Sequence, residues 1–228
     1  GVDLLVVSPN DYYALNSSLQ RAIDKKIPIV FFDRTTAIKD YTAYIGGDNI
    51  EAGRKMAEYA AMLCRDSVKT DGRQPIVLEM TGPLEISPAA QRHKGFSETI
   101  SRYSNIEYHN IPSKWSHDDC KRIMQEWLKG GKTVDVVFCH SDLAAIGAYE
   151  AAKELHKEHN IHFIGIDGLP GEGIDAVHNG QLSASYIYPT HGEEVIALAL
   201  RILEGKPFER VNNLKSFVVT PQNVADIS

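Results

Sequence analysis

Several short polar segments directly follow apolar runs of strand length, and they carry side chains that could bind a ligand. These segments are Asp33-Arg34, Ser141-Asp142 and Asp167. Carboxylates accept hydrogen bonds, whereas an arginine guanidinium donates several in a fixed planar fork. This mixture suits a neutral ligand that is rich in hydroxyl groups, because each hydroxyl both donates and accepts. The alternative is that these residues cap helices and pair with one another.

Three further residues extend this candidate set. Arg92 adds a second guanidinium from a predicted helix, and Tyr188 ends a predicted strand. Trp115 lies in a loop after a strand, where its ring could close the edge of a core or offer a flat face for a sugar ring. The candidate ligand-binding residues are therefore Asp33, Arg34, Arg92, Trp115, Ser141, Asp142, Asp167 and Tyr188.

Catalytic and nucleotide-binding patterns do not stand up to inspection. Cys139-His140-Ser141-Asp142 collects a nucleophile, a base and an acid, but neighbours on an extended chain point to opposite sides. Ser141 and Asp142 also stand where a helix cap belongs, before residues 143–145. The glycine-rich segment 165–173 lacks the spacing of a phosphate cradle. We therefore predict no catalytic residues and no cofactor.

The residues that most often ligate metals are also poorly placed for it. His156, His159 and His162 surround a charged turn at a helix end, which we interpret as solvated. The three cysteines are Cys64, Cys120 and Cys139, and no two have metal-ligand spacing. We interpret them as small core side chains and predict no metal site.

The composition is that of a globular protein: 43% of the 228 residues are hydrophobic and 24% are charged. A net charge of −6 argues against nucleic acid or an anionic membrane surface as the partner. The longest apolar runs are too short to span a membrane, so we expect a membrane connection only through flanking segments.

A repeated order of short apolar runs and longer helical patterns predicts the elements that position these residues. Such alternation favours an α/β fold of parallel sheets, with ligands bound beyond the carboxyl ends of the strands. We expect strands near 2–7, 28–32, 43–46, 76–80, 106–111, 134–139, 162–166, 184–188 and 217–219. Helices are expected near 15–23, 48–60, 89–103, 118–128, 143–156, 173–178 and 192–204.

Several motifs occur in one order along nearly the whole chain, and as a set they are specific. They resemble the ribose-, galactose- and fructose-binding periplasmic protein family, which is close in fold to the effector domains of lac-repressor-like regulators. The motifs lie in segments 1–9, 27–34, 45–49, 92–96, 140–147 and 165–168.

The resemblance implies two doubly wound parallel-sheet lobes joined by a multi-strand hinge. We place the first lobe at residues 1–70 plus 190–213 and the second at 71–189 plus 214–228, with crossings near 66–74, 188–192 and 211–217. Family members carry two strand-helix units before the strand at residues 1–7. The first lobe is therefore expected to lack its N-terminal strand-helix units, to favour self-association as a homodimer, and to bind sugar weakly or not at all in this 228-residue form.

The resemblance also implies roles for the candidate residues. Sugar hydroxyls would be held by Asp33 and Arg34 from the first lobe and by Arg92, Ser141 and Asp167 from the second, with Trp115 stacking on the ring. Two departures from the family argue against ribose as the ligand. Ser141 stands where asparagine is usual, and Tyr188 stands near the position of a frequent glutamine.

Three functions are compatible with this resemblance. The first is the extracytoplasmic sensor domain of a hybrid two-component histidine kinase, because segments 41–49, 186–190 and 218–227 are similar to those of carbohydrate sensors. The others are a free periplasmic binding protein of a sugar ABC transporter and the effector domain of a lac-repressor-like regulator. In each, a monosaccharide between the lobes would favour their closure. We expect a periplasmic location, with a membrane tether in the sensor case.

Overall fold

The computed structural model describes residues 1–66, 72–189 and 192–227. The chain forms two compact units. The first comprises Gly1–Asp48, Glu85–Pro88 and Pro189–Lys215, and the second comprises Asn49–Leu84, Ala89–Tyr188 and Ser216–Ser228. The predicted α/β architecture of parallel sheets is confirmed within each unit.

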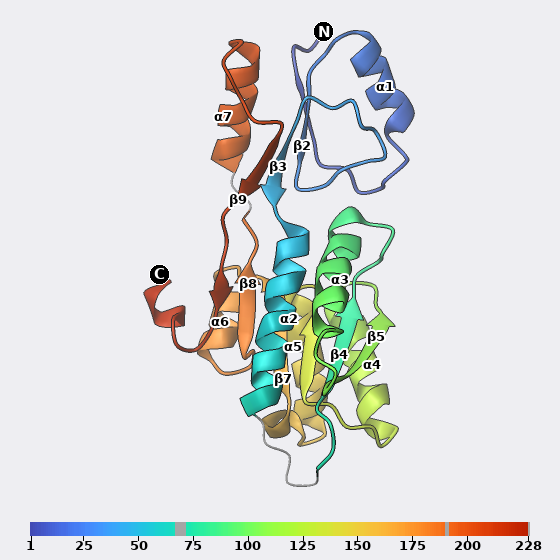
Figure 1. The fold of residues 1–228 in the computed structure, drawn as a ribbon, viewed down its shortest axis with the longest axis vertical. Coiled ribbons are helices and arrows are strands. Elements are labelled where there is room, and N and C mark those ends of the chain that lie inside the picture. The colour runs from blue at the N-terminus through green and yellow to red at the C-terminus, as the bar shows by residue number, and fades with distance from the viewer. Residues whose placement is uncertain (67–71, 190–191, 228) are drawn as a thin grey trace. The chain divides into compact units, whose positions relative to one another are not determined.

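The first unit contains a parallel sheet with the strand order β1-β2-β3-β9. Alternate side chains of β2 enter two separate apolar clusters, because successive residues of a strand point to opposite faces. Helix α1 contributes to one cluster and α7 to the other (Figure 1). The elements are β1 (Leu5–Val7), α1 (Asn16–Asp24), β2 (Ile29–Phe32), β3 (Ala43–Gly47), α7 (Gly192–Leu203) and β9 (Val211–Leu214).

The second unit contains a sheet with the order β10-β8-β7-β6-β4-β5. Among its described strands, β10 and β8 pair in antiparallel and the other neighbours pair in parallel. Its strands are β4 (Ile76–Thr81), β5 (Glu107–Pro112), β6 (Val136–Cys139), β7 (His162–Asp167), β8 (Ala184–Ile187) and β10 (Val218–Val219). Its helices are α2 (Asn49–Asp66), α3 (Ser87–Ile100), α4 (His117–Lys129), α5 (Asp142–Glu154) and α6 (Gly173–His178), with short 3-10 turns at Glu158–Asn160 and Val224–Asp226.

The strands of this second sheet are covered on both faces, which explains their nearly continuous apolar sequences. Leu78 and Met80 of β4 pack on the side of α4, α5 and α6. Val77 of β4 and Phe138 of β6 pack on the side of α2 and α3. Successive residues of one strand point into two different cores, so the residues on both of its faces must be apolar.

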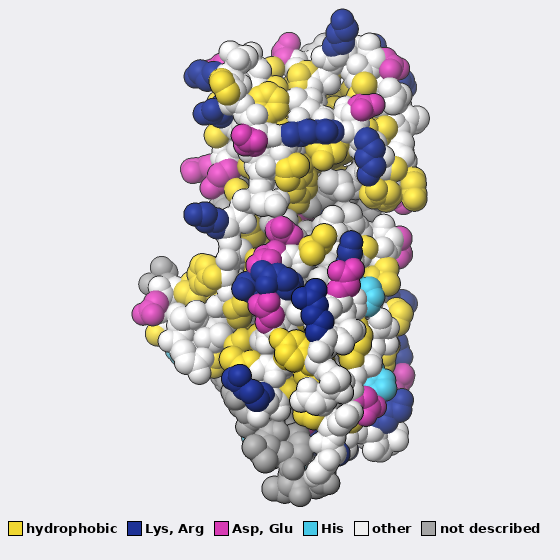
Figure 2. Space-filling view, viewed as in Figure 1, with side chains coloured by type: hydrophobic (Ala, Val, Ile, Leu, Met, Phe, Trp, Pro, Cys, Tyr) yellow, Lys and Arg dark blue, Asp and Glu magenta, His cyan; other side chains and the backbone are white. Residues whose placement is uncertain are grey.

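Helices α2 and α3 approach each other at backbone distance (Figure 1). A Cβ atom on Gly53 would lie 2.1 Å from the Arg92 carbonyl oxygen, and one on Gly95 would lie 2.1 Å from the Ile50 carbonyl oxygen. Each helix thus needs a glycine where it faces the backbone of the other. The exposed side of α2 carries charges of both signs, which lie side by side in Figure 2 and include ion pairs from Arg54 to Glu51 and Glu58.

Helix α2 belongs to the second unit, whereas the sequence-based prediction assigned residues 1–70 to the first lobe. Ala52, Met56 and Ala60 are fully buried in the core shared with α3 and the second sheet. The chain therefore passes to the second unit after Asp48, not near residues 66–74, of which 67–71 lie outside the described residues. The other two predicted crossing regions contain the passages after Tyr188 and Lys215.

Two further expectations concern single residues and segments. All three cysteines are buried and free, as expected for small core side chains. Of the helices in the described parts of the chain, none combines the length and the apolar character needed to cross a bilayer.

Candidate functional site

Arg92 is the best-connected member of the candidate set. Its side chain extends from α3, is only 3% exposed, and donates from Nε to Asn49 Oδ1 at 2.8 Å. Nη1 donates to the carbonyl oxygen of His140 at 2.5 Å and lies 3.8 Å from Asp167 Oδ1. Two fixed acceptors hold the planar guanidinium in one orientation. Asn49 begins α2, so the close approach of α2 and α3 places donor and acceptor together.

Two aromatic rings flank this guanidinium. The Arg92 Cζ atom lies 5.3 Å from the ring centre of Trp115 and 4.8 Å from that of Tyr188, within the range of cation–π attraction. Asn49 Nδ2 donates to the Tyr188 hydroxyl at 3.1 Å. Asn49 therefore binds both Arg92 and Tyr188, and it fixes the spacing of the cation and one ring.

The loop after β5 holds Trp115 through its own polar side chains. Ser113 Oγ donates to the Thr81 carbonyl at 2.7 Å and accepts from the Trp115 amide at 3.2 Å. Ser116 caps α4 by accepting from the amide of residue 119 at 3.3 Å. A Cβ on Gly82 would meet the Trp115 ring at 2.8 Å, so glycine is needed where the ring lies against the backbone.

Backbone strain coincides with the predicted site. Among the described non-glycine residues, Asp33, Trp115 and Asp167 have positive φ angles of 64°, 60° and 135°, together with Lys26 and His156. Positive φ is uncommon for residues with a Cβ and is frequently retained where function requires it. Three of the five described instances are candidate ligand-binding residues: Asp33 directly follows β2, Trp115 lies in the loop after β5, and Asp167 is the last residue of β7.

Asp142 supports the turn that carries Asp167. Its Oδ2 accepts from the Gly168 amide and from Ser185 Oγ, both at 2.7 Å. The carboxylate also packs against Gly165 of β7, where a Cβ would lie 2.2 Å from Oδ1. Burial raises the pKa of Asp142 to about 6, against the opposing effect of the two hydrogen bonds.

This geometry corrects the predicted role of Asp142 and defines that of Ser141. The Asp142 side chain is fully buried and points into the second unit, so it holds the turn instead of contacting a ligand. Ser141 is the N-cap of α5, with Oγ accepting from the Ala144 amide at 3.3 Å. The capping interpretation of this segment is therefore confirmed, while ligand contact by the Ser141 hydroxyl stays a prediction.

Asp33 and Arg34 lie together in the first unit. Arg34 Nη1 donates to Asn10 Oδ1 at 2.6 Å, and Arg34 Nε lies 3.6 Å from Asp33 Oδ2. Arg34 Nε is buried and makes no hydrogen bond with the described residues. A buried donor without a hydrogen bond is unusual, and the recorded polar contact of this nitrogen is its ion pair with Asp33. A ligand role for both residues stays a prediction.

Sequence inspection missed a buried polar cluster beneath Arg92. Glu79 of β4 is fully buried, and Oε1 accepts from His140 Nε2 at 2.8 Å. Its Oε2 binds His93 Nδ1 at 2.9 Å and accepts from the Tyr108 hydroxyl. A charged residue inside an otherwise apolar strand was the available signal, because a buried carboxylate requires partners.

The hydrogen bonds of this cluster fix its protonation pattern. His140 Nδ1 accepts from the Gly82 amide at 3.2 Å, so the neutral ring carries its proton on Nε2 and donates it to Glu79. Burial lowers the pKa of His140, in keeping with a neutral ring. Burial would raise the pKa of Glu79, but hydrogen bonds from His140 and His93 outweigh it and lower that pKa. The hydrogen bond to Glu79 raises the pKa of His93.

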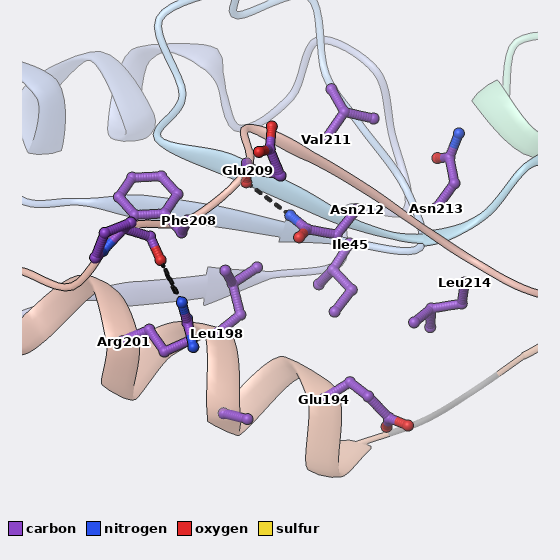
Figure 3. Close-up of a pocket in the computed structure, with 12 residues that line it drawn as sticks. Ile45, Glu194, Leu198, Arg201, Phe208, Glu209, Val211, Asn212, Asn213 and Leu214 are labelled. Carbon is purple, nitrogen blue, oxygen red and sulfur yellow. Dashed lines mark hydrogen bonds between the residues drawn. The ribbon is translucent and has the colours of Figure 1, made fainter.

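A separate groove of about 740 Å³ lies in the first unit between α7 and β9 (Figure 3). Two of its polar side chains bind nearby backbone: Arg201 Nη2 donates to the Pro207 carbonyl at 2.6 Å, and Asn212 Nδ2 donates to the Glu209 carbonyl at 2.8 Å. The groove contains none of the candidate residues. Within the described parts of the chain, no three His, Cys, Asp or Glu side chains are grouped to hold a metal ion.

Comparison with known proteins identifies relatives of this chain in sequence and in fold. A solved structure titled the fructose binding periplasmic domain of a hybrid two component system matches with a TM-score of 0.90 and 35% identity. The match covers all of this chain and 74% of that one. The ribose import binding protein of Salmonella typhimurium is 26% identical over 208 residues, which are 90% of this chain and 67% of the relative.

A third relative, the galactofuranose-binding protein of Escherichia coli, is 29% identical over 194 residues, covering 81% of this chain and 59% of the relative. The chain thus spans between about three fifths and three quarters of these proteins. The family model described as a periplasmic binding protein domain matches residues 1–207. Proteins of this family bind ligands and are not enzymes, which agrees with the absence of a catalytic pattern in the sequence. The chain therefore belongs to the periplasmic binding protein domain family.

Proposed function

We propose that this domain binds a monosaccharide through Arg92, Asp167 and Trp115. The observation that carries the proposal is the guanidinium of Arg92, which is fixed by Asn49 and His140 and lies within cation–π distance of two aromatic rings. Its remaining nitrogen, Nη2, donates to none of the described residues. A fixed donor beside a carboxylate and an aromatic face suits a ring that carries several hydroxyl groups.

Relatives support this ligand class. The similar proteins are named for fructose, ribose and galactofuranose, which differ in ring form and hydroxyl pattern but share the polyhydroxylated ring. The observed site differs from a site specialised for an anion, because Asp167 lies within 3.8 Å of the arginine and offsets its charge. A neutral sugar is therefore favoured over a sugar phosphate or a carboxylate ligand.

Within this class we favour the ligand-sensing domain of a hybrid two-component receptor, tethered to the membrane through flanking segments. The 35% identity to the periplasmic domain of such a system, over the whole chain, exceeds the 26% and 29% to the import and galactofuranose-binding proteins. The alternative is a free binding protein of a sugar transporter, which the name of the import relative supports.

Isothermal titration calorimetry of the full-length protein against fructose, ribose, arabinose and galactose tests the binding proposal. We expect one of these sugars to bind and Arg92→Ala or Asp167→Ala to abolish binding while thermal melting stays cooperative. Matched controls are Arg102→Ala and Asp118→Ala, because Arg102 is exposed and the Asp118 side chain is 98% exposed. Retained affinity in both site variants would refute the assignment of these residues.

A different measurement separates sensor from transporter component. The gene sequence downstream of Ser228 should encode a membrane-spanning helix and a kinase domain if the domain is a sensor. A neighbouring permease gene without a kinase would favour the transporter. The predicted closure of the two lobes stays a prediction, and small-angle X-ray scattering with and without the bound sugar would measure it.

A further inference from the structure

Glu79 connects the two segments that meet at Arg92. One segment ends in His140, whose carbonyl oxygen accepts from Arg92 Nη1, and the other is α3, where His93 directly follows Arg92. Glu79 Oε1 accepts from the His140 ring, and Oε2 binds the His93 ring. The Glu79 carboxylate therefore binds the ring of His140, whose backbone contacts Arg92, and the ring of His93, the residue next to Arg92.

Glu79 is too deeply buried for direct ligand contact. It is 0% exposed and lies in the layer between the sheet and α2 and α3, where Phe96 and Phe138 stack with their ring centres 4.3 Å apart. An apolar residue could fill such a position without the desolvation penalty of a carboxylate. Packing alone therefore does not account for the Glu79 carboxylate. The carboxylate does orient its hydrogen-bond partners, His140 and His93.

We propose that Glu79 is a positioning residue for the sugar site, which holds His140 and His93 so that Arg92 keeps one orientation. This inference rests on the proposed role of Arg92 in binding. The ring of His140 is held from both sides, by Glu79 and by the Gly82 amide, so the backbone at His140 cannot rotate without breaking one of these bonds. The same carboxylate limits rotation of α3 about its axis through His93.

The chemistry of the cluster requires an acceptor without donors of its own. His140, His93 and Tyr108 all meet the two oxygens of Glu79, and an ionised carboxylate can accept from all three. Glutamine at this position would direct an NH2 group at one of the partners. At least one hydrogen bond of the cluster would then be lost or reversed.

Two substitutions of His140 separate its two hydrogen bonds. In His140→Gln the amide nitrogen can reach the Nε2 position and still donate to Glu79. In His140→Asn the shorter side chain can accept from the Gly82 amide but cannot reach Glu79. The two variants are matched in chemistry and differ in the contact that the proposal requires. Glu79→Gln, measured in parallel, alters the same contact from the other side.

The first readout needs no ligand. In the 228-residue chain labelled with 15N-arginine, the Arg92 Nε–H group should give a protected, slowly exchanging NMR signal, because it donates to Asn49. We expect this protection to survive in His140→Gln and to decrease in His140→Asn and Glu79→Gln, because a guanidinium that the His140 carbonyl oxygen no longer fixes at Nη1 leaves its bond to Asn49 more often. Unchanged protection in both of the latter variants, with cooperative thermal unfolding, would overturn the proposal whether or not any sugar binds.

The second readout is sugar affinity in the full-length protein. We expect His140→Asn and Glu79→Gln to weaken binding about 10-fold, the size of one lost hydrogen bond to a charged group, and His140→Gln to restore it. If the Arg92 signal responds as expected but wild-type protein binds no sugar, the proposed function fails while the positioning of Arg92 by Glu79 stands. Equal affinity of the Gln and Asn variants of His140 would count against positioning.

Discussion

Replacing Asp142 with asparagine separates the charge of this buried carboxylate from its hydrogen bonds. Oδ2 accepts from Gly168 and Ser185, whereas Oδ1 is buried without a partner among the described residues. The asparagine carbonyl can accept both bonds, and its NH2 group would occupy the place of Oδ1. A buried NH2 group without an acceptor costs about 1–3 kcal/mol at every pH.

The charge contributes a cost that depends on pH. Burial raises the pKa of Asp142 from its ordinary value of 3.8 to about 6, and this difference corresponds to about 3 kcal/mol. Between these pH values the folded chain binds more protons than the unfolded chain, so the stability of the wild type falls as pH rises. Below pH 4 the cost is absent, and above pH 6 it is fully present. Asparagine cannot ionise and has no such term.

Urea unfolding at pH 4, 5, 6 and 7 measures this effect. The chain's two tryptophans, Trp115 and Trp127, both lie in the second unit, so their fluorescence reports the unfolding of the unit that contains Asp142. The stability of Asp142→Asn relative to the wild type should rise by about 3 kcal/mol from pH 4 to pH 7. A relative stability that is constant across this range would refute the reasoning. Asp118→Asn is the control, because that side chain is 98% exposed.

Two further perturbations test the packing and the protonation of the site. Gly53→Ala should destabilise the second unit by about 1–3 kcal/mol, because the new Cβ would lie 2.1 Å from the Arg92 carbonyl oxygen. Circular dichroism melts measure this loss of stability. Gly192→Ala is the nearly neutral control, because a Cβ on Gly192 meets no atom within 4 Å. His93 has a raised pKa, so its contribution to stability is fully present below about pH 6.5 and is lost as pH rises through the folded-state pKa. In urea unfolding between pH 6 and 9, the free energy of unfolding should therefore decline less steeply in His93→Gln than in the wild type. An identical pH slope in both proteins would contradict this.

The candidate site shows where sequence reasoning reached and where it stopped. Asp33 and Asp167 were predictable because each is the first charged residue at the end of an apolar strand, whereas Trp115 was predictable only from its place in a loop after β5. The sequence also contained a signal for Glu79, a lone charge within β4, but not the identity of its partners. Those partners come from α3, β5 and the end of β6, which are distant in sequence.

The sequence by itself determined the α/β class, the succession of strands and helices, and the capping role of Ser141, because each depends on local periodicity and turn chemistry. Only the tertiary structure decided that α2 packs with the second unit and that Asp142 points inward. The residues around these positions are apolar or small on more than one face, so the sequence alone does not indicate which helix or strand will cover them. That choice is made when Gly53 and Gly95 let two helices meet, and when Gly165 leaves room for the carboxylate of Asp142.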